Sequence, residues 1–171
     1  LPGTGGIPKP SGGVYRPDMK LYKSYNGFMK EGDTEASWYF NFGGPRLQKA
    51  LNVTFDGQTV QTITFKDTLG AGMTCPLKTI YLHAIDSEEN PSQSLLLDKG
   101  METGPTTGEQ GTFEVTGECG EMAPDGTTPI TFVAKGPFRA KTNYSLSYRT
   151  LFTGDGKPIP GTNYTNTVSV D

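Results

Sequence analysis

The chain alternates between apolar and polar residues over many short segments. A period of two residues is that of a β-strand, because successive side chains of a strand point to opposite sides of a sheet. In ASWYFNF, for example, Trp38, Phe40 and Phe42 share one face. The same reasoning predicts at least eight strands, most of them rich in the β-branched and aromatic residues that strands prefer: residues 19–25, 36–42, 59–69, 77–84, 112–116, 130–134, 143–150 and 164–170.

Turn sequences separate these segments, among them DGQ, PDGTT and GDGKP. The 23 Gly and 13 Pro residues are distributed between the apolar runs, as expected of many short strands joined by turns. Helical character is confined to two short candidates, residues 45–52 and the polar stretch 86–90. We therefore expect an all-β fold: an immunoglobulin-like β-sandwich with Greek-key connections and one or two short helical turns, with a closed barrel as the alternative.

The first residues differ in composition from the rest of the chain. Residues 1–13, LPGTGGIPKPSGG, hold almost no core-forming side chains and are predicted to be a Pro/Gly-rich linker or arm, followed by one domain over residues 14–171. The LPGTG at Leu1–Gly5 matches the L-P-x-T-G that sortases recognise, but a whole domain follows it. A linker or a tag is therefore expected there rather than a wall anchor.

Composition and charge exclude several classes of function. The net charge is −3 and no cluster of Lys and Arg is interleaved with aromatics, so we expect no nucleic-acid partner. No apolar run has the length of a transmembrane helix, so no membrane insertion is expected in this segment. A single His and the lack of a G-x-S-x-G motif argue against a hydrolase.

The two cysteines, Cys75 and Cys119, are far apart and have no metal-ligand spacing. The acidic stretch DSEEN and the loop GDGKP lack the spacing of a calcium loop, so neither a metal nor a cofactor is predicted. The cysteines form either a disulfide or two inert core thiols. Other indications of an extracellular setting favour the disulfide.

Three residues interrupt the apolar faces of the expected strands. Lys23 follows Met19 and Leu21, while Asp67 and Asn166 each stand between large apolar residues of the same parity. Individually, Lys23 could extend to the sheet edge, Asp67 could cap a turn and Asn166 could bond to a neighbouring backbone. Because the exceptions include one each from the first and last strands, they favour a joint explanation.

The segments KSYNG, ITFKDTLGAGM and YSLSYRT…YTNTVSV resemble the collagen-adhesin-type immunoglobulin-like domains of Gram-positive surface adhesins and pilins. The resemblance implies a spontaneous isopeptide bond between the amine of Lys23 and the carboxamide of Asn166, with Asp67 as the assisting acid. Burial disfavours the charged forms of both Lys and Asp, which leaves a nucleophilic amine beside a proton donor. Lys20 and Asn163 remain rival partners for the bond.

The resemblance further implies a structural or adhesive domain of an extracellular, cell-wall-attached protein. Its expected partners are adjacent domains of a longer chain and an unidentified ligand on a host or neighbouring cell. It would be no enzyme, since self-crosslinking is a single turnover. The alternatives are a eukaryotic secreted binding module glycosylated at the N-x-[ST] sites Asn52, Asn143 and Asn163, and a secreted hydrolase.

Overall fold

The structure, a computed structural model, describes residues 13–16, 19–25, 35–75, 79–87, 94–101, 104–105, 113–153 and 166–170. For residues 13–16, 19–25, 101, 104–105 and 166–167 it describes the backbone alone. Several sequence predictions fall outside these ranges: the Leu1–Gly5 motif, the arm as far as residue 12, Asn163 and the loop GDGKP.

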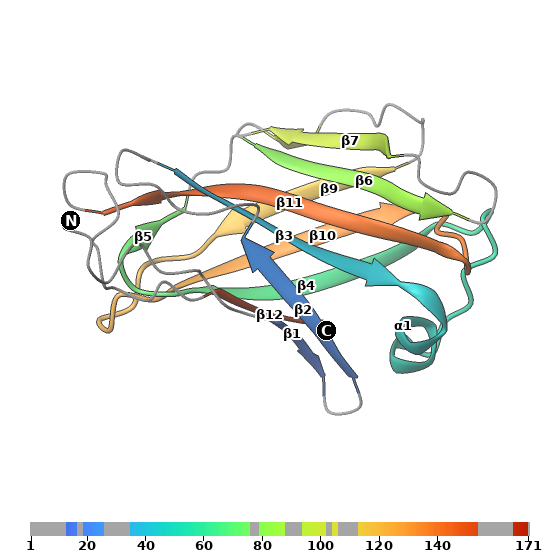
Figure 1. The fold of residues 1–171 in the computed structure, drawn as a ribbon, viewed down its shortest axis with the longest axis horizontal. Helices are drawn as coiled ribbons and strands as arrows, with labels where there is room; N and C mark the ends of the chain where they lie inside the picture. Colours follow the sequence, from blue (N-terminus) through green and yellow to red (C-terminus); the bar gives the residue numbers. More distant parts are fainter. Residues whose placement is uncertain are drawn as a thin grey trace, which may run out of the picture.

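The described part of the chain is built from β-strands with one short helix (Figure 1). In chain order the elements are β1 (Gly13–Arg16), β2 (Met19–Tyr25), β3 (Glu35–Gly43), α1 (Gly44–Leu51), β4 (Gln61–Leu69), β5 (Met73–Thr74), β6 (Ile80–Ser87), β7 (Leu95–Met101), β8 (Gly104–Pro105), β9 (Glu114–Cys119), β10 (Thr128–Gly136), β11 (Thr142–Phe152) and β12 (Asn166–Val170).

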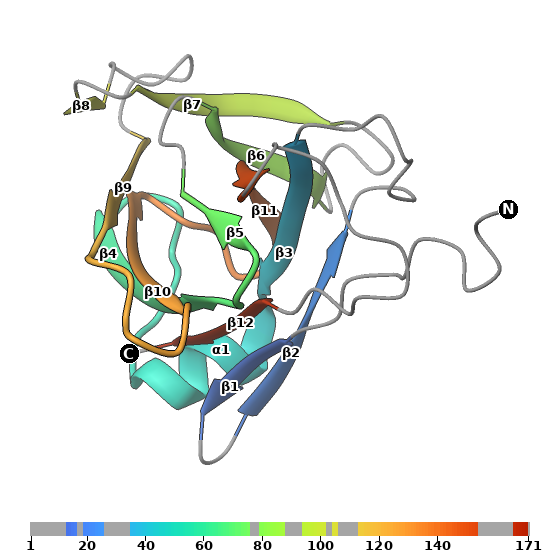
Figure 2. The ribbon, with the colours of Figure 1, turned by 90° about the vertical axis from the view of Figure 1, so that its left-hand side faces the viewer.

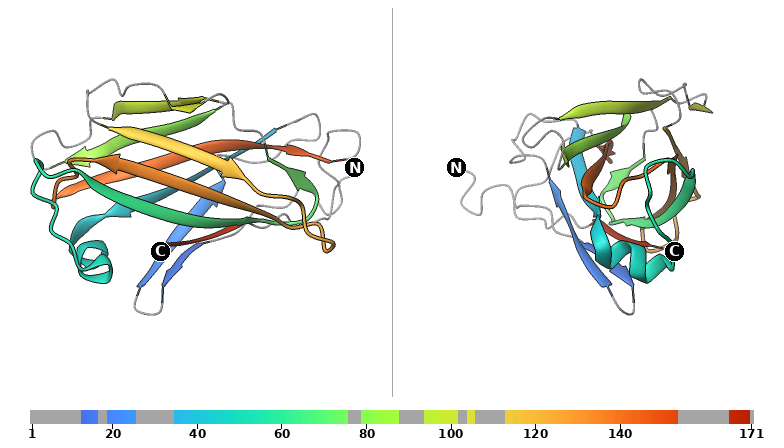
Figure 3. Two further views of the ribbon diagram at one scale, coloured as in Figure 1. Left: turned by 180° about the vertical axis from the view of Figure 1, so that it is seen from behind. Right: turned by 90° about the vertical axis from the view of Figure 1, so that its right-hand side faces the viewer.

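The strands form two layers that pack face to face (Figure 2). Sheet 1 contains β1, β12, β4, β10 and β9 in that order, and its last three strands lie side by side in the rear view of Figure 3. Sheet 2 contains β3, β11, β6, β7 and β8, with β5 beside the end of β11. The predicted all-β, immunoglobulin-like sandwich is therefore confirmed.

One strand, β2, connects the two sheets. Its first residues, Met19 to Tyr22, pair with β1 of sheet 1, whereas Lys23 to Tyr25 pair with β3 of sheet 2. The described ladders are antiparallel except that between β1 and β12, which is parallel. One side of the sandwich is thus closed by continuous strand pairing.

At the opposite side of the sandwich, a hydrogen bond to a side chain links the two sheets. The fully buried Asp98 of β7 accepts a hydrogen bond at 2.8 Å from the backbone N–H of Val115 in β9. Among the described residues, β7 and β9 share no ladder pairing, so the alternative of a closed barrel is not what forms.

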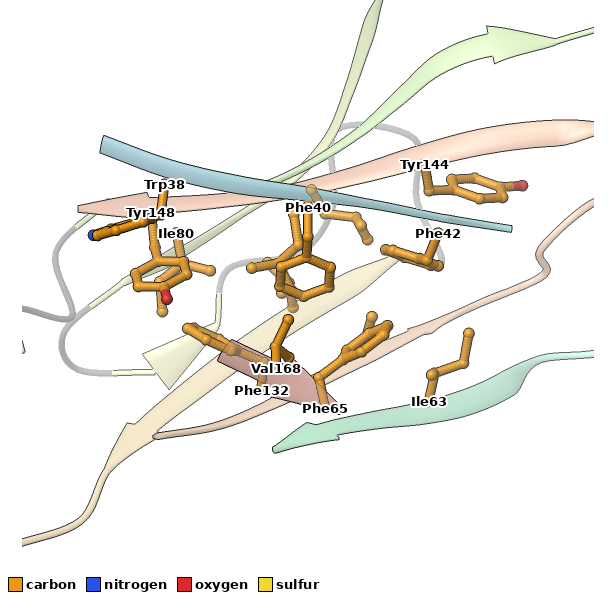
Figure 4. Packing of buried hydrophobic residues seen from close by; sticks show 14 of the residues in the cluster. Trp38, Phe40, Phe42, Ile63, Phe65, Ile80, Phe132, Tyr144, Tyr148 and Val168 are labelled. Atoms are coloured by element: carbon orange, nitrogen blue, oxygen red, sulfur yellow. The ribbon is translucent and has the colours of Figure 1, made fainter. Parts of the chain in front are cut away.

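Aromatic side chains fill the space between the sheets (Figure 4). The ring centroids of Phe40 in sheet 2 and Phe65 in sheet 1 are 4.8 Å apart, and those of Phe132 and Tyr148 are 4.7 Å apart. Burying each large apolar side chain stabilises the fold by roughly 1.5–3 kcal/mol. The core is therefore continuous from one sheet to the other.

The predicted disulfide is confirmed. Cys75, which directly follows β5, is bonded to Cys119 at the end of β9, with a Cα–Cα distance of 6.3 Å. The bond therefore joins an end of sheet 2 to the outer strand of sheet 1.

The helix predicted over residues 45–52 is confirmed as α1, but the second helical candidate is wrong where it can be compared. Asp86 and Ser87 belong to β6, because they continue its ladder by pairing with Asn143 and Thr142 of β11. Strands β1, β5, β7 and β8 were not predicted, and Gly13, the last residue of the predicted arm, begins β1.

Candidate functional site

The candidate site is centred on Asp67, a carboxyl group inside the core. Residues of β4 alternate between inward and outward, and Asp67 occupies an inward position with 2% of its surface exposed. Its ladder partners are Val168 of β12 and Ile130 of β10, both of them buried. The sandwich therefore holds an ionisable group between apolar neighbours, where a carboxyl needs hydrogen bonds to be tolerated.

Tyr148 supplies a hydrogen bond to this carboxyl. Its phenol O–H donates to Asp67 Oδ2 across 2.7 Å, and Tyr148 itself is 1% exposed. Figure 4 shows the Tyr148 hydroxyl directed away from β11 toward the opposite sheet, beside Phe132. The bond therefore crosses the core from sheet 2 to sheet 1.

The backbone register relates Lys23 to Asn166. Leu21 of β2 and Val168 of β12 both pair with Val14 of β1. Lys23 lies two residues after Leu21 on a strand antiparallel to β1, and Asn166 lies two residues before Val168 on a strand parallel to β1. Both positions are displaced toward the same end of β1. Lys23 and Asn166 are thus each two residues from the level of Val14, in the same direction and with the same strand parity, and at Lys23 the strand β2 has passed from β1 to β3.

The distance between these two positions suits a covalent link. Where β2 and β12 both flank β1, at Leu21 and Val168, their Cα atoms are about two strand spacings apart, roughly 10 Å, and Lys23 and Asn166 each lie two residues from that level. An extended Lys side chain joined to an Asn side chain spans about the same distance between Cα atoms. The backbone geometry is therefore compatible with a direct Lys–Asn bond.

Asp67 is close to this level of the sheet. Asn166 pairs with Leu69, which is the next inward position of β4 after Asp67. On the other side, Lys23 pairs with Phe40 of β3. The register thus brings the backbone positions of all three predicted residues to one region of the fold.

The strand register also places Lys20, the rival amine for the proposed bond. Lys20 pairs with Tyr15, and the pairing from Met19 to Tyr22 runs without a bulge. Lys20 is three positions before Lys23 in β2, so alternation along the strand predicts opposite parity for the two residues, and the ladder with β1 ends at Tyr22, between them. The rival acceptor Asn163 lies outside the described residues.

A second buried tyrosine on β11 offers a comparison. Tyr144 is four residues from Tyr148 and also inward, but its phenol oxygen accepts a hydrogen bond at 2.8 Å from the backbone N–H of Arg139. Burial raises the pKa of Tyr144 above its ordinary value. The two tyrosines are thus alike in burial and different in their hydrogen-bond partners.

Sequence reasoning did not identify Tyr148 as part of the site. The available signal was its inward parity in YSLSYRT, because a buried tyrosine hydroxyl normally requires a hydrogen-bond partner. That signal could not name the partner, which is 81 residues away in the chain.

Among the described side chains, no group of three or more His, Cys, Asp or Glu residues could hold a metal ion. No helix in the described ranges is long and apolar enough to cross a membrane.

Residues 18–171 match a family described as a domain of unknown function, DUF7926. The match extends over Lys23, Asp67 and Asn166. No curated protein matches the chain.

Proposed function

We propose that this chain, which belongs to the DUF7926 family, is a structural and adhesive domain of a Gram-positive cell-surface adhesin or pilin. In this proposal the domain is extracellular and part of a cell-wall-attached protein, and an isopeptide bond between Lys23 and Asn166 crosslinks it. Its partners are adjacent domains and a ligand on a host or neighbouring cell. The observation that supports it is the common level and parity of Lys23 and Asn166 beside the buried acid Asp67.

The proposed reaction replaces one amide by another. The neutral Nζ of Lys23 attacks Cγ of Asn166, the new C–N bond forms, and the bond from Cγ to the amide nitrogen breaks. Asp67 donates a hydrogen bond to the Asn166 carbonyl oxygen, gives its proton to the departing nitrogen and regains one from Nζ. The products are the crosslink and one molecule of ammonia, and no oxidant or reductant is required.

In this proposal both reacting groups are buried in the core. Burial favours an uncharged amine and a protonated carboxyl, which are the reactive forms of the two groups. Strand pairing holds the reactants at a fixed level, so no encounter between separate molecules is needed. Each chain reacts once, so the process is self-modification rather than enzymatic turnover.

The proposed bond has a mechanical consequence. It encloses nearly the whole domain, and closing a loop of that length stabilises the fold by roughly 4–5 kcal/mol in the chain-entropy treatment used for disulfides. Tension that enters near β2 and leaves near β12 would pass through a covalent bond instead of separating hydrogen-bonded strands. This behaviour suits a protein that bears load at a cell surface.

The intact mass of the purified, reduced chain tests the proposal. We expect a value about 17 Da below the sequence mass, since one ammonia is lost. Lys23→Ala and Asn166→Ala should abolish that loss, whereas the matched controls Lys20→Ala and Asn163→Ala should retain it. A wild-type chain of full mass contradicts the proposal, and added hexose masses would favour the glycosylated module instead.

A further inference from the structure

We infer that Tyr148 is a positioning residue for crosslinking, which it assists by orienting Asp67 and making it a stronger acid. The inference rests on the proposed function. It adds a residue that the sequence motifs do not contain.

The geometry at Tyr148 fixes one oxygen of the Asp67 carboxyl. The 2.7 Å bond from the phenol O–H to Oδ2 is buried at both ends. The phenol ring is held in turn by Phe132, whose centroid is 4.7 Å away, and its strand position is fixed by pairing with Trp38 of β3. Asp67 is therefore held by its backbone in sheet 1 and by its carboxyl from sheet 2.

The hydrogen bond makes the two carboxyl oxygens inequivalent. Because Oδ2 accepts a hydrogen bond from the phenol O–H, the acidic proton of a neutral Asp67 belongs on Oδ1. The torsion that rotates the Asp carboxyl group has a broad and nearly two-fold distribution of angles. Without the hydrogen bond from Tyr148, either carboxyl oxygen could therefore carry the proton. The flanking Val168 and Ile130 are apolar side chains, which cannot make that distinction. Tyr148 thus determines which oxygen delivers the proton.

The same bond lowers the cost of proton transfer. When Asp67 gives its proton to the departing nitrogen it becomes a carboxylate, and a donor on Oδ2 stabilises that form. Tyr148 keeps its own proton throughout, so the balance of the reaction is unchanged. The hydrogen bond from Tyr148 therefore both orients the Asp67 carboxyl group and increases its acidity.

Refolding kinetics test this role. Full-length chain dissolved unreacted in denaturant is refolded by dilution, and the appearance of the product about 17 Da lighter is followed by mass spectrometry. A hydrogen bond to a developing charge predicts that Tyr148→Phe slows the reaction about 10- to 100-fold. Tyr144→Phe, which also removes a buried tyrosine hydroxyl from β11, should react at the wild-type rate.

The dependence of the rate on pH separates positioning from a loss of packing. Around Asp67, β11 presents the phenol of Tyr148, β12 and β10 present the apolar Val168 and Ile130 and, by the proposal, β2 presents Lys23. At alkaline pH the rate falls as the acid loses its proton. Without the phenol donor the carboxylate is less favoured, so this fall should move to higher pH in Tyr148→Phe.

A second variant preserves the shape of the ring. 3-Fluorotyrosine at position 148 is a more acidic phenol and a stronger donor, so it should move the alkaline fall to lower pH. Opposite shifts for the two substitutions support the inference, and the shift to lower pH with 3-fluorotyrosine supports it alone if Tyr148→Phe folds poorly. The inference is overturned if 3-fluorotyrosine leaves the pH at which the crosslinking rate decreases unchanged. It is also overturned if Tyr148→Phe reacts at the wild-type rate, or if Tyr144→Phe slows the reaction as much as Tyr148→Phe does. If instead the wild-type chain keeps its full mass, the proposed function itself fails and this inference with it.

Discussion

Removing the Cys75–Cys119 disulfide should lower the free energy of unfolding by about 4 kcal/mol. The two residues are 44 positions apart, and crosslinking a loop of this length removes about 4 kcal/mol of conformational entropy from the unfolded chain. The loop contains β6, β7 and β8, which make up the outer part of sheet 2, and β9, the edge strand of sheet 1. The bond therefore restricts the strands that sit furthest from the β2 connection.

The native state should change little in a Cys75→Ala/Cys119→Ala variant. Both cysteines are half-buried at the border of the core, so the packing lost is on the order of 1 kcal/mol for each side chain. The main effect is thus on the unfolded chain. For a domain of this size, the loss corresponds to a thermal midpoint lower by roughly 8–16 °C.

Urea unfolding followed by tryptophan fluorescence is a suitable assay, because the single Trp38 is fully buried. We expect a lower midpoint together with a steeper dependence on urea, since the open unfolded chain exposes more surface. A double variant within about 1 kcal/mol of wild type would refute the reasoning from loop entropy. Two titratable thiols in the unfolded, unreduced wild-type chain would refute the disulfide itself.

Three other expectations concern single residues. Asp98→Ala should cost about 1–3 kcal/mol in urea unfolding because the buried Val115 N–H loses its acceptor; an equal loss for Asp98→Asn would contradict this. Gly117→Ala should cost about 1–3 kcal/mol, since the new Cβ would lie 2.6 Å from Ile80 Cδ1, and an unchanged thermal midpoint would disprove it. Burial lowers the pKa of His83 below 6.5, so the unfolded chain binds more protons there and stability should fall as pH drops through that value. His83→Gln should remove this pH dependence.

Sequence periodicity predicted the parts of the fold in which one face of a strand is buried. Trp38, Phe40 and Phe42 follow the pattern because β3 lies between the core and solvent. Strand β7 was missed for a definite reason. A bulge near Leu97 places that residue and the adjacent Asp98 inside together, which destroys the alternation on which the prediction depends.

The candidate site was predictable only in part. Asp67 was identified because a carboxyl stands out among apolar residues of one strand, and the structure shows it buried. Its bond with Tyr148 depends on which strands face each other across the core. The common level of Lys23 and Asn166 depends on the parallel pairing of β1 with β12. Both are properties of long-range topology, which local periodicity does not contain.

Tryptic peptide mapping with tandem mass spectrometry tests the proposed crosslink most directly. Trypsin cleaves after Lys and Arg but not before Pro, so a bond at Lys23 should yield a branched peptide joining residues 21–30 to residues 150–171. Its mass should be about 17 Da below the sum of the two parts, with fragment ions that locate the branch at Lys23 and Asn166. Recovery of both segments as separate, unmodified peptides would contradict the account. A branched peptide that instead ends at Lys23 would assign the bond to Lys20.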